Sequence, residues 1–99
     1  KDFAACPTEP QDAAWHIYET DDGTVVHAIV KIAPADAHLW SMGCGDFNGE
    51  ARPKWVSEVL PPGWKLKTIP DTWSCGRERR VIHVKEGLVI RALLVPHAD

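Results

Sequence analysis

The first third of the chain alternates apolar and polar residues on either side of an Asp-Asp-Gly sequence at 21–23. The flanking segments are rich in β-branched and aromatic residues, so the pattern predicts a β-hairpin over 14–33. A four-residue loop at 20–23 places Trp15 opposite Ala28, which gathers the large apolar side chains on one face. That predicted buried face consists of Trp15, Ile17, Val26, Ala28, Val30 and Ile32.

A second hairpin is predicted over 79–95, because two β-rich segments flank Lys-Glu-Gly at 85–87. A three-residue loop with Gly87 in the left-handed conformation sorts the faces best. One predicted face then contains Ile82, Val84, Leu88, Ile90, Ala92 and Leu94, and the other contains Val81, His83, Val89, Arg91 and Leu93.

Three shorter elements are predicted between the hairpins. Residues 36–42 favour one helical turn with Asp36 as its N-cap. A helix is predicted over about 51–60, because Pro53 is tolerated only in a first turn and Trp55, Val56, Val59 and Leu60 recur at helical spacing. Residues 64–69 alternate with a period of two and predict a half-buried strand.

This order of elements predicts an α+β fold. We expect an antiparallel sheet of about five strands, made of two hairpins plus the middle strand, with one main helix on one face. The helix stripe is expected to pack on the sheet, and residues 1–99 are expected to form one compact domain with an irregular lead-in at 1–12. The expected contacts of the helix are Trp15, Ile17, Val30, Ile82 and Ile90.

Composition and charge narrow the classes of partner. The chain has 99 residues, of which 44% are hydrophobic and 25% charged, as in ordinary globular domains. The formal charge of −3 does not favour a nucleic-acid partner, since such binding neutralises phosphates with basic residues. No apolar run is long enough for a membrane-spanning helix, so no membrane partner is expected. Either a monomer or a small homo-oligomer fits the sequence.

The three cysteines leave the redox state open. Cys44 and Cys75 both lie in glycine-containing loop sequences, so a disulfide between them is one interpretation, with Cys6 unpaired. Three reduced thiols are the other, and the protein is accordingly either cytoplasmic or secreted after processing.

Two constellations of residues could carry chemistry. Glu78, His83 and Arg91 supply the residue types of a small nuclease, but strand alternation separates His83 from Glu78. His16 and His27 face each other in the predicted first hairpin and could share a metal ion. Two ligands are too few for a tight metal site. We therefore interpret the histidine pair as part of a solvated sheet face and the charged residues around Glu78 as a solvated strand edge, and no cofactor is expected.

The sequence gives weaker support to a catalytic cysteine or to a zinc site that uses cysteine. Cys44 as a nucleophile would need His38 or His83 beside it, and a zinc set of His38, Cys44 and Cys75 matches no standard spacing.

The leading hypothesis is a non-catalytic protein-binding domain that acts by stoichiometric interaction with, or inhibition of, a protein partner. Five tryptophans and glycine-rich loops in a small acidic chain are typical of an interface. The binding surface is predicted in loops 43–49 and 71–77. Its candidate residues are Trp40, Asp46, Phe47, Trp73 and Arg77.

Overall fold

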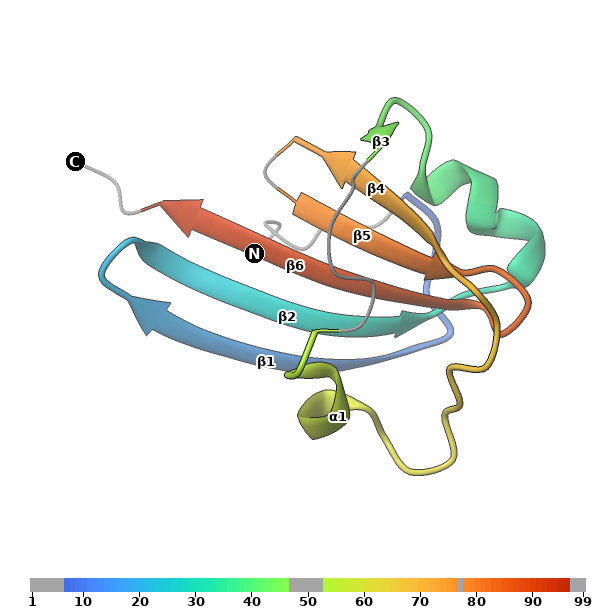
Figure 1. The fold of residues 1–99 in the computed structure, drawn as a ribbon, viewed down its shortest axis with the longest axis horizontal. Coiled ribbons are helices and arrows are strands. Elements are labelled where there is room, and N and C mark those ends of the chain that lie inside the picture. Colours follow the sequence, from blue (N-terminus) through green and yellow to red (C-terminus); the bar gives the residue numbers. More distant parts are fainter. Residues whose placement is uncertain (1–6, 47–52, 77, 97–99) are drawn as a thin grey trace.

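The fold is a six-stranded antiparallel sheet, seen in a computed structural model that describes residues 7–46, 53–76 and 78–96 (Figure 1). Its strands lie side by side in the order β1-β2-β6-β5-β4-β3. The described part is mostly β, so the antiparallel sheet is confirmed, whereas the α+β class holds only roughly. The strands are β1 (Asp12–Thr20), β2 (Gly23–Lys31), β3 (Gly45–Asp46), β4 (Asp71–Cys75), β5 (Glu78–His83) and β6 (Leu88–Pro96).

The first hairpin has the predicted register, but Thr20 also pairs with Gly23, so the turn has two residues, 21–22, instead of the predicted four. Glu19 lies opposite Thr24, and Trp15 lies opposite Ala28. The burial of its predicted apolar face is only partly right: the β2 residues on that face are buried, but Trp15 and Ile17 are 45% and 49% exposed. The reason is topological, because β1 is an edge strand that the covering elements do not fully reach.

The second hairpin differs from the predicted register by one residue. His83 pairs with Leu88, so four residues, 84–87, form the loop. Gly87 has a φ of 68°, as predicted, and its N–H donates to the carbonyl of His83 over 2.9 Å. Both faces of this hairpin are apolar, so alternation alone could not choose between the two registers.

Two short helices cover opposite faces of the sheet. The 3₁₀-helix η2 (Pro34–Trp40) covers one face, with Trp40 in a cluster with Ala28, Val30 and Ile82. This helix begins three residues earlier than predicted, with Ala33 rather than Asp36 at its N-cap.

The helix α1 (Val56–Val59) covers the other face. It is shorter than predicted, and residues 51 and 52 lie outside the described part. Val56 packs with Ile29, Val81 and Ile90. Of the five predicted sheet contacts of this helix, only Ile90 belongs to its cluster, because α1 sits on the face opposite to the one expected.

The segment 64–69 is not a strand, although its burial alternates as predicted. Trp64 and Leu66 pack on the α1 cluster. The backbone N–H groups of Lys67 and Thr68 both donate to the Glu86 carboxylate over 3.0 Å, and the Thr68 hydroxyl donates to it as well. These bonds lower the pKa of Glu86. The carboxylate also accepts hydrogen bonds from backbone N–H groups that would otherwise bond to a neighbouring strand.

Candidate binding surface

The two loops predicted to bind a partner are held together. A disulfide joins Cys44 to Cys75, as one of the two interpretations predicted, with their Cα atoms 4.6 Å apart. Beside it, Gly45 pairs with Ser74 and Asp46 pairs with Trp73. Residues 71–75 are therefore strand β4 rather than part of a loop, and the short strand β3 is fixed to its edge.

Trp73 lies between two carboxylates on one face of the sheet. Asp46 is its partner across the β3–β4 pair, and Asp71 lies two residues before it on β4. Side chains two residues apart on a strand, and those of directly paired residues, share a face. Both aspartates are exposed, and Trp73 is half-buried against the Trp40 cluster, so a partly accessible tryptophan shares this face with two negative charges.

A hollow of about 290 Å³ opens beside Trp73, between η2 and the end of the sheet. Apolar side chains form most of its lining, and His38, Ser41 and Asp71 add polar groups. The lining residues are Pro34, Ala37, His38, Ser41, Asp71, Trp73, Ile82 and Val84.

A buried ion cluster lies under the same helix. Glu78 accepts hydrogen bonds from Arg80 Nε and Arg91 Nη2, each at 2.8 Å. Both guanidinium groups lie 5.4 Å from the centre of the Trp40 ring, and Arg80 Nη1 donates to the Trp40 carbonyl over 2.7 Å. Burial raises the pKa of Glu78, but the hydrogen bonds from Arg91 and Arg80 outweigh it and lower the pKa overall.

Of the three residues of the hypothetical nuclease, Glu78 and Arg91 belong to this cluster and His83 does not. Arg80 pairs with Arg91, and Glu78 pairs with Leu93, so Glu78 and both arginines share the face under η2. His83 is buried on the opposite face, where its strand partner Leu88 belongs to the α1 cluster. The one-residue change of register brings Arg91 to Glu78, and the three predicted groups do not converge on one site.

The predicted binding residues differ in where the structure places them. Asp46 and Trp73 lie side by side, as described above. Trp40 is 0% exposed, so in this structure it supports the surface from within and cannot contact a partner. Phe47 and Arg77 lie outside the described residues. Asp71 was missed because its segment reads as a loop; its spacing of two from Trp73 identifies it once β4 is recognised.

His16 and His27 face each other, as the register predicted, but they are parts of an aromatic cluster. The His27 ring stacks on Trp55 with centroids 4.2 Å apart. Tyr18 lies 5.2 Å from His16 and 5.4 Å from His27. Within the described ranges no group of three or more His, Cys, Asp or Glu residues could hold a metal ion, so the pair gains no third ligand of these types there.

The partly buried position of His27 predicts a pH effect on stability. Burial, and the charge of His16 next, lower the pKa of His27 below 6.5. The unfolded chain therefore binds this proton more readily, and the free energy of unfolding falls as the pH drops through 6.5 and levels off below the folded pKa. We expect His27→Gln to make the decrease between pH 7 and 5 shallower in urea titrations.

An NMR titration of the imidazole resonances checks the cause. We expect His16→Gln to raise the pKa of His27, because the repulsive charge is gone, whereas His38→Gln, at an exposed site on η2, leaves it unchanged. An unaltered His27 titration in His16→Gln would contradict the electrostatic coupling.

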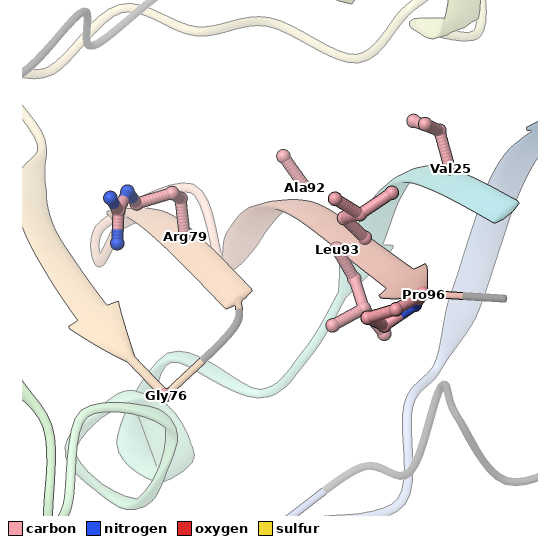
Figure 2. A pocket seen from close by; sticks show the side chains of 7 residues that line it. Val25, Gly76, Arg79, Ala92, Leu93 and Pro96 are labelled. Carbon is pink, nitrogen blue, oxygen red and sulfur yellow. The ribbon is translucent and has the colours of Figure 1, made fainter. Parts of the chain in front are cut away.

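A larger hollow of about 540 Å³ lies at the far ends of β2 and β6 (Figure 2). Figure 2 shows Arg79 at one side and Val25 at the other, with Ala92 and Leu93 between them. Among the described residues that line it, Arg79 alone is charged, and its Nη1 donates to Ser74 Oγ over 2.7 Å. The described lining of this hollow therefore offers fewer polar side chains than the hollow beside Trp73, which has His38, Ser41 and Asp71.

Comparisons with known proteins give no functional information. No family model, no curated protein and no solved structure matches the chain. In the part of the chain that the structure describes, no helix has the length and apolar character needed to cross a membrane.

Proposed function

We propose that this chain is a non-catalytic protein-binding domain whose partner places a lysine or arginine side chain against Trp73. The observation that carries the proposal is the half-buried Trp73, which lines the 290 Å³ hollow together with Asp71 and is paired with the exposed Asp46 across the β3–β4 pair. The interaction would be stoichiometric, because the domain would act on its partner by binding alone and would not turn it over.

The chemistry of the surface fits a basic side chain. An aromatic face attracts a cation by about 0.5–2 kcal/mol, depending on desolvation. Carboxylates form charge-assisted hydrogen bonds with guanidinium and ammonium groups. The apolar lining suits the methylene stem, because long basic side chains bury their stems and keep the charge near water.

The size of the hollow favours a side chain over a free ligand. Small-molecule sites usually measure about 300–1,000 Å³ and enclose most of the ligand. A hollow of about 290 Å³ lies at the lower end of that range. One inserted side chain, flanked by contacts along β4, therefore suits the surface better than a free small ligand.

The surface is also preorganised. The disulfide and the β3–β4 pair hold Asp46 against Trp73 before any partner arrives. Fixing a loop in advance lowers the entropic cost of binding. A small rigid surface can therefore bind with useful affinity although few residues take part.

A selection of phage-displayed peptides tests the proposal. We expect peptides selected on the wild-type protein to be enriched in Lys or Arg next to an apolar residue. Their affinity should fall at least about tenfold with Trp73→Ala or Asp71→Asn, as expected when an interface anchor is truncated. Calorimetry measures the change.

Matched controls come from the other edge of the sheet. Trp15→Ala removes a tryptophan that is more exposed than Trp73, and Asp21→Asn removes an exposed carboxylate in the β1–β2 turn. Both should leave the affinity unchanged. Selection without basic enrichment, or peptides whose affinity is indifferent to Trp73→Ala, would show that this surface assignment is wrong.

A further inference from the structure

The strand β1 forms the opposite edge of the sheet from the surface around Trp73. Figure 1 shows it as the last strand on its side. Large apolar side chains project from both of its faces: Trp15 and Ile17 are 45% and 49% exposed on one, and Tyr18 is 38% exposed on the other. No described strand pairs with its outer edge, so nine residues of extended chain present a row of backbone groups.

The usual protections of an edge strand are missing from β1. Proteins block such edges with lysine, proline, bulges or a covering element. Residues 13–18 read Ala-Ala-Trp-His-Ile-Tyr, without a charged residue, proline or glycine. An exposed, long and apolar edge of this kind is a template for another strand.

The hairpin geometry fixes which backbone groups point outward. The turn at 21–22 has two residues, so Thr20 and Gly23 form the closing pair that faces inward. Backbone groups alternate along a strand, so Trp15 and Ile17, with Ala13 and Glu19, direct their N–H and C=O groups to the outer edge. A second strand must bond to these four residues.

We propose that β1 of one copy pairs antiparallel with β1 of a second copy, around a two-fold axis at His16. This register overlaps all nine residues of both strands. It places Trp15 opposite Ile17 of the second copy, and the reverse, with both residues in the outward-bonding set. Their exposed surfaces then cover each other as aromatic–β-branched cross-strand pairs, which stabilise antiparallel sheets.

The charges of β1 are compatible with this self-pairing. Asp12 lies opposite Thr20 of the second copy, and Glu19 lies opposite Ala13, so like charges never face each other. Tyr18 lies opposite the small Ala14, which leaves room for the ring. An axis moved one residue to Ile17 would instead set Trp15 opposite Glu19 and leave Asp12 without a partner within the strand.

The expected association is specific but weak. The paired strands exchange about eight backbone hydrogen bonds through the four outward residues of each copy. A single pair of strands buries less surface than a standard interface, and small interfaces are typical of transient complexes. The pair joins two sheets into one continuous sheet and leaves both Trp73 surfaces at its outer ends.

Cysteine cross-linking tests the axis directly. In a Cys6→Ser background, His16→Cys should oxidise rapidly to a covalent dimer, because residue 16 faces its own copy in a close, non-hydrogen-bonded pair. Ala14→Cys alone and Tyr18→Cys alone should stay monomeric under the same conditions. Their equimolar mixture should cross-link, because residue 14 faces residue 18.

Light scattering and sedimentation of the unmodified chain provide the second measurement. The mean mass should rise toward twice 11.0 kDa with concentration. Ile17→Lys should weaken the association at least about tenfold, whereas Met42→Lys, at an exposed apolar residue far from β1, should not. A monomer at every concentration, or equal cross-linking of the Ala14→Cys and His16→Cys variants, would overturn the proposal and leave the Trp73 surface unaffected.

Discussion

Replacing Glu78 with glutamine is expected to lower the free energy of unfolding by about 3–5 kcal/mol at pH 7. Glu78 is the shared anion of Arg80 and Arg91, and its side chain is only 8% exposed. Without the carboxylate, two cations remain near each other under Trp40 with less compensation for their lost hydration. Urea denaturation followed by tryptophan fluorescence measures the change.

Acid should reduce the difference between the Glu78→Gln variant and the wild type. The pKa of Glu78 is lowered on folding, so its contribution to stability is present above about pH 4.5 and is lost as the pH falls through the folded pKa. The control is Glu58→Gln, which removes an exposed carboxylate on α1 and should change stability by less than about 0.5 kcal/mol. Equal losses in both variants, or a gap that does not narrow in acid, would contradict a specific role of the cluster.

Removing the disulfide is the second change with a large expected effect. The double variant Cys44→Ser/Cys75→Ser should lose about 3–4 kcal/mol of stability, by the loop-entropy relation for a separation of 31 residues. The cross-link restricts the unfolded chain between η2 and β4, and most of that restriction disappears with it. Thermal and urea unfolding of the variant, beside the reduced and oxidised wild type, give the value.

The same variant should weaken binding more than its stability alone explains. The disulfide fixes Asp46 to the edge of β4, so its loss lets the two carboxylates move apart around Trp73. We expect basic peptides to bind at least about tenfold more weakly at temperatures where the variant is fully folded. Gly45→Ala is the matched control, because a Cβ there meets no atom within 4 Å. If the folded cysteine variant bound the peptides with the wild-type affinity, the disulfide would have no role in preorganising the surface.

The ion cluster and the disulfide act on one region from two sides. Arg80 bonds to the Trp40 carbonyl and lies opposite Trp73 in the β4–β5 pair. The cluster therefore lies beside Trp73 on the neighbouring strand, while the disulfide joins the segment that carries Asp46 to the end of β4. The buried ion cluster and the disulfide therefore both lie next to the proposed binding surface.

Local chemistry in the sequence predicted the elements that depend on neighbouring residues. The first hairpin, with His16 opposite His27, followed from the Asp-Asp-Gly turn and from one apolar face. The left-handed conformation of Gly87 followed from turn chemistry. The pairing of Cys44 with Cys75 was one of two open interpretations, and the tertiary structure decided between them.

Only the tertiary structure decided the register of the second hairpin, the state of 64–69 and the edge position of β1. The second hairpin is apolar on both faces, because η2 and α1 cover opposite sides, so periodicity could not distinguish its two registers. The segment 64–69 gives its backbone bonds to a distant carboxylate instead of a neighbouring strand. Trp15 is exposed because of where its strand lies in the sheet order, which is a property of the whole fold and not of the residues beside it.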